Sequence, residues 1–340
     1  MRVTYKPKFE RSAELLRNLI EASGLCEWFR QQMIDVSWLA PAQREAFARL
    51  AHYSTGIEGN PLTLPEVRAL AEGGTIHGDE KAELEVTNYF AALRWIWARG
   101  RGEIREKDIL KLHKILTGGL LSATESGAYK IKQNAVFSRG KIIFQPPPPE
   151  AAHILMSSLL SWVNSASARK EHPVIAAGIA HHRLVSIHPF MDGNGRIARA
   201  LESWILFKGG FDTKHIFSLD EFFYHDRDRY YGEIEKVRRR NDNLTSWLEY
   251  VIAGILETLR NTRNRIQILR LKKPSRKIVL SPKQERILNI LSQAPFMSGG
   301  DLSRALNISR SYLSKLLQPL VRAKLIVKEG STKAASYRAR

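Results

Sequence analysis

One short segment, from His188 to Arg199, concentrates the residue types that phosphate chemistry needs. His188 can titrate near neutral pH, so it could take a proton from an attacking hydroxyl. Asp192 is a hard oxygen ligand, and a carboxylate beside phosphates is expected to hold Mg²⁺. Arg196 and Arg199 are three residues apart, so they share one helix face and could reach the same polyphosphate. The segment therefore predicts a base, a metal ligand and an anion site.

The backbone of this segment is predicted to turn directly into a helix. Pro189 ends the preceding helix, and Gly193 and Gly195 let the chain turn tightly and approach a ligand closely. The helix predicted from about Asn194 has first N–H groups without internal partners, at the positive end of its dipole. Such a helix start suits phosphate. For any one residue taken alone, a helix-capping loop with surface arginines and a packed histidine is the open alternative.

The segment resembles the Fic family signature, His-Pro-Phe-x-Asp/Glu-Gly-Asn-Gly-Arg-x-x-Arg, at every defined position, and the resemblance covers roughly residues 1–260. It implies a Mg²⁺-dependent protein adenylyltransferase that transfers AMP from ATP to a Ser, Thr or Tyr hydroxyl and releases pyrophosphate. By resemblance, His188 deprotonates that hydroxyl, and Asp192 holds Mg²⁺ on the ATP phosphates. The resemblance implies that Gly193, Asn194 and Gly195 form the anion hole and that Arg196 and Arg199 bind the distal phosphates.

Two further positions are assigned to the nucleotide by resemblance. Asp228-Arg-Tyr-Tyr231 is similar to the family helix whose tyrosines line the adenine pocket, and aromatic faces stack on bases. Tyr231 and Val136 are therefore expected to contact the nucleotide, although a tyrosine on a helix is as often part of the core. Gly195 favours AMP transfer over phosphate transfer, because the phosphotransferase-like branch of the family has lysine at that position.

A second motif lies far upstream, where Ser54-Thr-Gly-Ile-Glu58-Gly-Asn60 resembles the inhibitory motif of the family, Ser/Thr-x-x-x-Glu-Gly/Asn. The resemblance implies Ser54 and Glu58 as inhibitory residues, with Glu58 paired to Arg199 so that the γ-phosphate of ATP is displaced. The alternative is an ordinary helix C-terminus capped by Gly59 and Asn60. Because the same glutamate serves AMP removal in some relatives, a deAMPylase is a further alternative function.

A short hairpin interrupts an otherwise helical chain. Gln133–Phe144 has β-branched and aromatic residues around Ser-Arg-Gly-Lys, and prolines 146–149 must end the hairpin. By resemblance, residues 133–144 are a flap on which a segment of the protein substrate docks as an added strand. Apolar residues at helical spacing predict helices over 41–57, Glu85–Ala98, Glu106–Leu116, Pro173–Ile187 and Thr245–Leu259.

The C-terminal part of the chain has most of the formal net charge of +19. Such a basic block suggests DNA or another polyanion as a partner of residues 281–340. Helices over 282–292, 300–306 and 309–320, followed by two strands, match the order of a winged helix-turn-helix domain. Ser309–Leu317 has the pattern of a recognition helix, and Pro319 is expected to end or kink that helix early. Docking of protein partners is the alternative.

The sequence thus predicts an all-α Fic core with a short β-hairpin flap and a C-terminal winged helix-turn-helix domain. The predicted domains are an N-terminal helical region with the inhibitory helix (1–100), a catalytic core (101–260), a linker (261–280) and the winged domain (281–340). A single cysteine, Cys26, excludes an internal disulfide. No leader or membrane span is evident, so we expect a cytoplasmic protein without a membrane partner, with a homodimer as one option. The alternative function is a DNA-binding transcriptional regulator whose core only senses nucleotide.

Overall fold

The computed structural model consists of two compact units, Met1–Arg30 with Gln43–Asn264 and Gln31–Ala42 with Arg265–Arg340. Its helical character confirms the predicted fold class. The described residues are 5–31, 36–76, 78–138, 141–212, 215–216, 218–272, 280–292, 296–323, 325–330 and 335–339. Among these residues, no helix is both long and apolar enough to cross a membrane.

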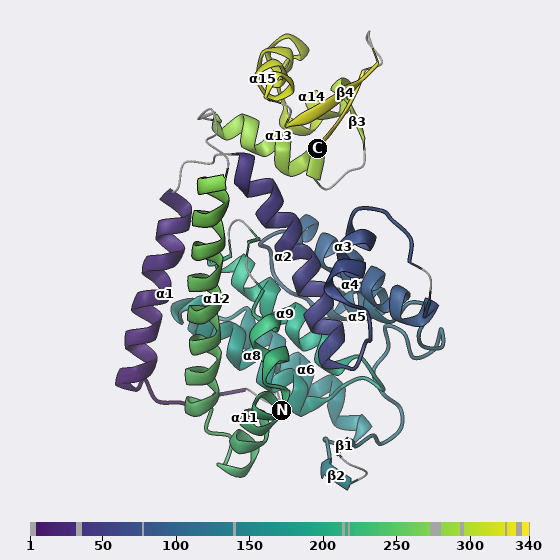
Figure 1. The fold of residues 1–340 in the computed structure, drawn as a ribbon. Coiled ribbons are helices and arrows are strands. Elements are labelled where there is room, and N and C mark those ends of the chain that lie inside the picture. The colour runs from purple at the N-terminus through teal and green to yellow at the C-terminus, as the bar shows by residue number, and fades with distance from the viewer. Residues whose placement is uncertain are drawn as a thin grey trace. The chain divides into compact units, whose positions relative to one another are not determined.

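The first unit is built around α8 (Pro173–Ile187), which is buried on almost every side. Its partner, α9 (Asn194–Lys208), follows after a short loop, and the two helices lie at the centre of this unit in Figure 1. A helix that is apolar all round must be surrounded by other helices. The other helices that lie wholly or mostly in this unit are α1 (Ala13–Gln31), α2 (Val36–Ile57), α3 (Leu64–Ala71), α4 (Glu80–Arg99), α5 (Glu106–Thr117), α6 (Pro149–Val163), α7 (Ala166–Lys170), α10 (Asp220–His225), α11 (Arg227–Arg239) and α12 (Thr245–Lys272).

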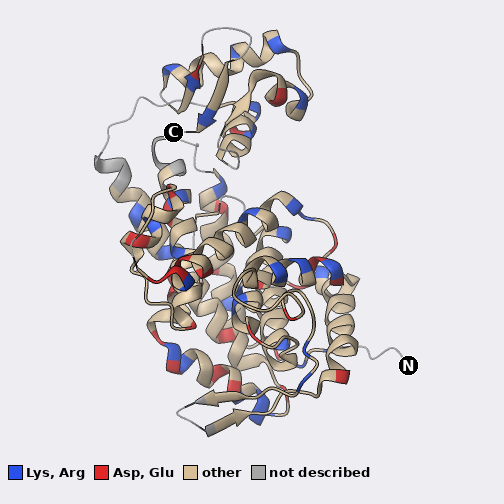
Figure 2. Ribbon diagram, turned by 90° about the vertical axis from the view of Figure 1, so that its right-hand side faces the viewer, with Lys and Arg blue, Asp and Glu red and all other residues tan. Residues whose placement is uncertain are grey.

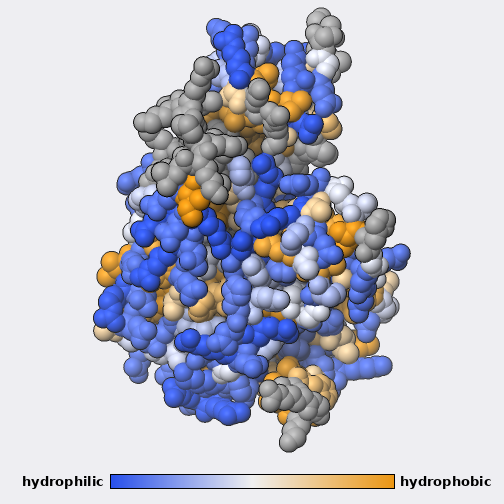
Figure 3. Space-filling view, in the orientation of Figure 1, coloured by the Kyte–Doolittle hydropathy of each residue, from blue (hydrophilic) through white to orange (hydrophobic). Residues whose placement is uncertain are grey.

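The predicted hairpin is present as β1 (Val136–Ser138) and β2 (Lys141–Phe144), which pair antiparallel. Phe137 and Ile142 face each other across the pair, and their exposed fractions are 63% and 57%. Figure 3 shows hydrophobic side chains gathered over this part of the molecule. The prolines that follow lead directly into α6, whose first position is Pro149, where the missing N–H costs no helical hydrogen bond. Residues 139–140 of the predicted flap lie outside the described residues.

The helix predicted to end at Leu259 is longer than expected. It continues as α12 to Lys272, so the first part of the predicted linker, 261–280, is helical. Ile266 is almost fully buried, as Leu259 is, so the apolar stripe of the helix extends one further two-turn repeat. The charged residues of this stretch had concealed that stripe. Residues 273–279 lie outside the described residues, and the predicted domain boundaries stay predictions.

The C-terminal unit contains the elements of a winged helix-turn-helix domain, as predicted. A three-stranded antiparallel sheet has the order β3-β5-β4, and apolar residues from every helix pack into one core. Lys and Arg are more frequent than Asp and Glu on this unit in Figure 2. The elements are α13 (Pro282–Ser292), β3 (Met297–Ser298), α14 (Gly299–Leu306), α15 (Arg310–Arg322), β4 (Ile326–Glu329) and β5 (Ser336–Ala339).

Pro319 does not end the predicted recognition helix, contrary to expectation. It lies inside α15, which continues to Arg322. A proline in a helix interior costs about 3 kcal/mol through a lost hydrogen bond and a steric clash. Leu320, directly after it, is fully buried in the core of the domain, as are its neighbours one turn earlier. Burial of the last turn therefore outweighs the local cost of the proline.

Candidate active site

His188 lies where α8 ends, and its backbone conformation turns the chain away from the helix axis. It has φ 51° and ψ 56°, a left-handed conformation in which its N–H still donates to Leu184 O at 2.9 Å. On the ring, Nδ1 is 3.3 Å from Val185 O. Since a carbonyl oxygen only accepts, Nδ1 carries the hydrogen and Nε2 keeps its lone pair. The geometry therefore leaves Nε2 as the atom able to accept a proton.

The surroundings of His188 keep its ring neutral. The pKa of His188 is lowered to about 4, below the near-neutral value expected from sequence, and burial is the largest cause. The hydrogen bond to Val185 O and the charge of Glu58 oppose this shift, whereas the cations Lys130 and Arg238 contribute to it. His188 is only half-buried, so part of the residue stays accessible. A neutral imidazole with a free Nε2 is the form that a general base requires.

The loop after His188 is held from outside by His113 on α5. Gly127 N–H donates to His113 Nδ1 at 2.9 Å, so His113 Nε2 carries the hydrogen and donates to Asp192 O at 3.0 Å. The ring also stacks on Phe190, with centroids 3.8 Å apart. Burial lowers the pKa of His113 to about 4, which keeps this tautomer neutral. His113 was missed from sequence because its position on α5 is that of a core residue.

The start of the hairpin is connected to the same loop through buried polar groups. Lys130 N–H donates to Pro189 O at 2.8 Å, and Lys130 Nζ donates to Asn134 Oδ1 at 2.7 Å. Asn134 Nδ2 in turn donates to Phe190 O at 2.8 Å. Burial lowers the pKa of the Lys130 ammonium. Lys130, to which the sequence assigned no role, thus connects the hairpin to the loop that carries the candidate base.

The side chain of Asn194 forms its hydrogen bonds with the backbone of the loop itself. Its Oδ1 accepts from Phe190 N at 3.0 Å, and its Nδ2 donates to Phe190 O at 2.8 Å. If Asn194 belongs to an anion hole, it contributes its backbone N–H, as the first residue of α9. Gly193 before it has φ 78°, and a β-carbon there would lie 3.1 Å from Thr117 Cγ2. The helix start is therefore held in place from both sides with its amides available.

Arg199 is fully buried and bound to the end of α2. Its Nη2 lies 2.7 Å from Glu58 Oε1 and donates to Ser54 O at 2.8 Å, and its Nε donates to Ser54 Oγ at 2.8 Å. A β-carbon at Gly195 would overlap the Glu58 carboxylate. The structure thus brings together Ser54, Glu58, Gly195 and Arg199, which are distant in sequence. The close approach of the Glu58 carboxylate explains why glycine is needed at position 195.

One nitrogen of Arg199 is left over. Nη1 is buried and has no hydrogen-bond partner among the described residues, and it would lie 3.1 Å from a β-carbon at Gly195. A buried donor without a partner costs free energy unless a ligand satisfies it. Because this donor lies beside the glycine-rich start of α9, the site fits an anionic group such as a phosphate.

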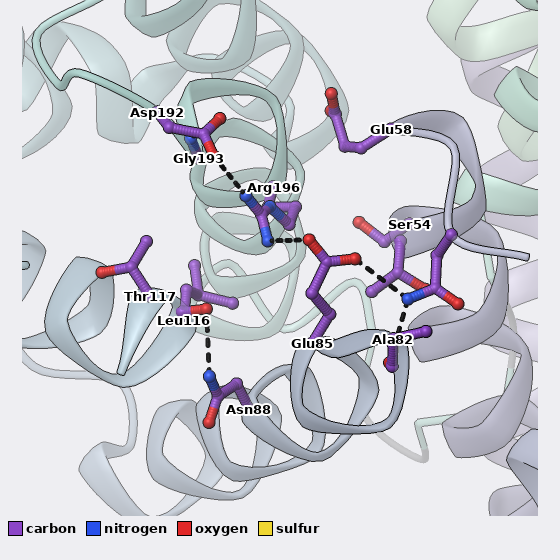
Figure 4. A network of polar contacts seen from close by, with 12 residues as sticks. Ser54, Glu58, Ala82, Glu85, Asn88, Leu116, Thr117, Asp192, Gly193 and Arg196 are labelled. Atoms are coloured by element: carbon purple, nitrogen blue, oxygen red, sulfur yellow. Dashed lines mark hydrogen bonds and ion pairs between the residues drawn. The ribbon is translucent and has the colours of Figure 1, made fainter. Parts of the chain in front are cut away.

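Arg196 has different partners, although it lies on the same helix face. It is buried, with Nη1 3.0 Å from Glu85 Oε1 and Nη2 3.1 Å from Asp192 Oδ2, as Figure 4 shows. Its charge is therefore balanced by two carboxylates. Asp192 itself is 65% exposed, so its carboxylate can turn to another cation.

The described residues contain no group of three or more His, Cys, Asp or Glu side chains arranged for a metal ion. A Mg²⁺ ion at Asp192 would therefore take its other ligands from phosphates and water. This is the usual manner in which Mg²⁺ binds beside a nucleotide. The single exposed carboxylate fits that manner of binding.

The two neighbouring tyrosines of α11 have different environments. Tyr230 is buried, and its hydroxyl lies 2.9 Å from His181 Nε2, so it belongs to the core, together with His181 and His182. Tyr231 is 39% exposed, and its hydroxyl donates to Ile57 O at 3.5 Å, next to Glu58. Val136 is half-buried on β1. The nucleotide contacts predicted for Tyr231 and Val136 stay predictions.

Residues 103–206, which include His188, the loop after it and most of α9, match the model of the Fic/DOC family. These residues form a Fic/DOC domain. The Fic domain is followed by a second match, to winged helix-turn-helix DNA-binding domains, over residues 280–327. Both matches agree with the folds of the two units.

Relatives extend this similarity beyond the Fic domain. The chain is 36% identical over 179 residues to "Protein adenylyltransferase Fic" of Drosophila virilis, across 52% of this chain and 36% of that protein. The match to the Drosophila willistoni protein is also 36% identical and covers 35% of it. The matched stretch thus spans about a third of the length of these relatives.

Solved structures show the same fold. Fic-1 from C. elegans is 25% identical, with a TM-score of 0.65, over 75% of this chain and 74% of that one. A Fic family protein from Desulfovibrio desulfuricans G20 is 23% identical, with a TM-score of 0.70, over 99% of this chain and 98% of that one. The latter similarity concerns the fold alone, and it extends over the whole chain.

Proposed function

We propose that this protein is a Mg²⁺-dependent adenylyltransferase that transfers AMP from ATP to a Ser, Thr or Tyr hydroxyl of a target protein. The observation that carries the proposal is His188, a neutral imidazole whose Nε2 has no hydrogen-bond partner among the described residues, in the loop that leads into α9. The names of the Drosophila relatives support the same activity. A protein that only sensed nucleotide would have no need of a base at this position.

In the proposed reaction, His188 Nε2 takes the proton of the target hydroxyl as the oxygen forms a bond to the α-phosphorus of ATP. The bond between the α-phosphorus and the bridging oxygen breaks, and pyrophosphate leaves. The first amides of α9 and the spare Nη1 of Arg199 bind phosphate oxygens and offset the developing charge. Mg²⁺, when bound, would neutralise charge on the phosphates beside Asp192. The exposed hairpin would hold the target segment as an additional strand.

We further infer that Glu58 inhibits this reaction. Its carboxylate lies against Gly195 and occupies Arg199, the side chain proposed for the distal phosphate. A bound γ-phosphate would compete for the same guanidinium, and two anions cannot share it without repulsion. ATP is therefore expected to bind weakly, or with its phosphates misplaced, until Glu58 moves.

Labelling with ATP that carries ³²P at the α-position tests both parts. With Mg²⁺ present, Glu58→Gly should label itself or added protein much more strongly than the wild type, and Glu58→Gly combined with His188→Ala should not become labelled. ATP labelled at the γ-position is the control, because AMP transfer leaves no γ-label on protein. Equal labelling of wild type and Glu58→Gly would refute inhibition, and label that persists without His188 would refute the proposed base.

A second function, DNA binding, is favoured by the C-terminal domain. Ser309 caps α15, on which Arg310, Ser311, Ser314 and Lys315 are exposed while Leu313, Leu316 and Leu317 are buried. A basic exposed face on the second helix of this motif is the arrangement that enters a major groove. Arg310→Ala with Lys315→Ala should weaken DNA binding in a mobility-shift assay and reduce its salt dependence by about two charges. Unchanged binding would show that this face does not contact DNA, and a wild type that fails to bind DNA would point to protein partners instead.

A further inference from the structure

The segment after Glu58 is held by the side chain of Asn60. Asn60 Nδ2 donates to Ala82 O and to Glu85 Oε2, both at 2.9 Å, and Asn60 Oδ1 accepts from Leu62 N at 3.1 Å. All the hydrogen-bonding atoms of this amide side chain therefore have a partner. The side chain of Asn60 therefore connects the segment after α2 to α4 through a backbone carbonyl and a carboxylate.

The other oxygen of Glu85 reaches the Fic signature. Glu85 Oε1 lies 3.0 Å from Arg196 Nη1, and Arg196 Nη2 lies 3.1 Å from Asp192 Oδ2. In Figure 4 the Glu85 carboxylate lies between Arg196 and the end of α2 that carries Glu58. Glu85 is largely buried, at 16% exposure, and Arg196 more so, at 4%. Charge-assisted hydrogen bonds between such buried groups are strong and have defined directions.

We propose that Glu85 is a positioning residue that joins the inhibitory segment to Arg196 through Asn60. In this arrangement Glu58 is held over Gly195 by two contacts, its own pair with Arg199 and the Asn60–Glu85 contact. The inference rests on the proposed inhibitory role of Glu58 and adds a second determinant of it. Glu85 belongs to neither the signature nor the inhibitory motif.

The position of Glu58 depends on Asn60 because both belong to one helix terminus. Asn60 N–H donates to Thr55 O at 3.2 Å, and Gly59 between them has φ 99°, so the backbone turns sharply within two residues. When Asn60 is released from α4, this turn loses its external support, and the Glu58 carboxylate loses its place over Gly195. Release of the Asn60–Glu85 contact should therefore favour the state that binds triphosphate.

By thermodynamic linkage, if release of the Asn60–Glu85 contact favours triphosphate binding, then triphosphate binding must favour release of that contact. Arg196 orients the Glu85 carboxylate toward the loop, and a ligand that draws Arg196 or Asp192 to phosphates removes that constraint. The Glu85 carboxylate, which accepts a hydrogen bond from Asn60, then becomes free to rotate. Binding of Mg²⁺ and ATP at the signature would in this way weaken the hold on the segment that carries Glu58.

The experiment measures the Kd of Mg-ATP by isothermal titration calorimetry on the full chain, in a His188→Ala background that prevents turnover. Asn60→Ala should tighten Kd by about tenfold, since one hydrogen bond to a charged acceptor is lost from the inhibited state. In the Glu58→Gly background, Asn60→Ala should have no further effect. Asn88→Ala is the matched control, because Asn88 lies on α4 with Glu85 but donates to Gly118 O at 2.8 Å and makes no hydrogen-bond contact with Asn60 or Glu58 among the described residues.

Asn60→Asp is the second variant. It keeps the shape of the side chain and the acceptor for Leu62 N–H, while its charge repels Glu85, so it should tighten Kd as Asn60→Ala does. Urea unfolding of each variant shows whether the fold is retained.

The outcomes separate the two levels of the argument. If Glu58→Gly does not tighten Kd, the proposed inhibition by Glu58 is wrong. If Glu58→Gly tightens Kd while both Asn60 variants leave it unchanged, the role assigned to Glu85 is wrong and the inhibition stands. An Asn60 effect of equal size with and without Glu58, or an equal effect of Asn88→Ala, would also overturn the inference.

Discussion

Replacement of Glu58 by alanine should make the protein less stable without nucleotide and more responsive to it. The guanidinium of Arg199 is fully buried, whereas the Glu58 side chain is 32% exposed. Removal of one partner of a fully buried ion pair costs about 3–5 kcal/mol. Here the exposure of Glu58 and the buried carboxyl of Asp220 near Arg199 reduce that cost. We therefore expect the free energy of unfolding to fall by about 2 kcal/mol.

Mg-ATP should stabilise Glu58→Ala more than it stabilises the wild type. A ligand at one hundred times its Kd stabilises the folded state by about 2.7 kcal/mol, and Glu58→Ala should gain this in full because its Arg199 no longer has a carboxylate that phosphate must displace. The wild type should gain less, since ATP must first displace Glu58. Urea unfolding followed by tryptophan fluorescence measures both quantities, because residues 281–340, predicted as the winged domain, contain no tryptophan.

Glu21→Ala is the control for this experiment. Glu21 pairs with Arg260 at 2.5 Å, but the two side chains are 45% and 50% exposed. Its removal should cost less than about 1 kcal/mol and should not change the response to nucleotide. If Glu58→Ala were as stable as the wild type, or if Mg-ATP stabilised the two proteins equally, competition between Glu58 and phosphate for Arg199 would be refuted.

Three further results are expected. In urea titrations, Glu85→Ala should lower the free energy of unfolding by about 3 kcal/mol, because Arg196 loses a largely buried partner. Asp192→Ala should lower it by less than about 1 kcal/mol, because the partner that Arg196 loses is exposed. Equal losses of stability in the two variants would contradict this ranking. The pKa of His188 is about 4 in the folded protein and 6.5 in the unfolded chain, so its contribution to stability is present above pH 6.5 and is lost as pH falls towards 4. The AMP-transfer rate should therefore fall on the acid side near pH 4. A fall near pH 6.5 would contradict the burial of the ring. His113→Ala should lower kcat about tenfold or more in AMP-transfer assays, because Asp192 O and Phe190 lose their support; an unchanged kcat would show that the loop holds itself.

The chemistry at the signature could be predicted from sequence because it is local. His188, Asp192 and Arg199 follow each other within one loop and one helix, so their spacing alone brings them to one place. The folds of the two units, the hairpin and the pair of Glu58 with Arg199 were also anticipated, the last from the resemblance of two separate motifs. The length of α12 was not, because its buried apolar positions are hidden among charged residues.

The groups that position the signature could not be found in this way. His113, Lys130 and Glu85 lie far from the loop in sequence, and each occupies a place where a histidine, lysine or glutamate needs no special explanation. Their roles follow only from hydrogen bonds across helices: His113 to Asp192 O, Lys130 to Pro189 O and Glu85 to Arg196. A pattern in one sequence contains no information about such partners, because neither residue type nor spacing specifies them.

The two signature arginines illustrate what this means for function. Spacing on one helix face predicted that Arg196 and Arg199 act alike on the phosphates. In the structure, each arginine forms an ion pair with a carboxylate from a different part of the chain. Arg199 pairs with Glu58, and Arg196 pairs with Glu85. Glu58 is half-exposed at a helix end and can leave, whereas Glu85 is buried in mid-helix and cannot leave without disturbing α4. Arg199 is therefore the arginine that ATP takes from its partner more readily, whereas drawing Arg196 to phosphates requires competition with a largely buried partner.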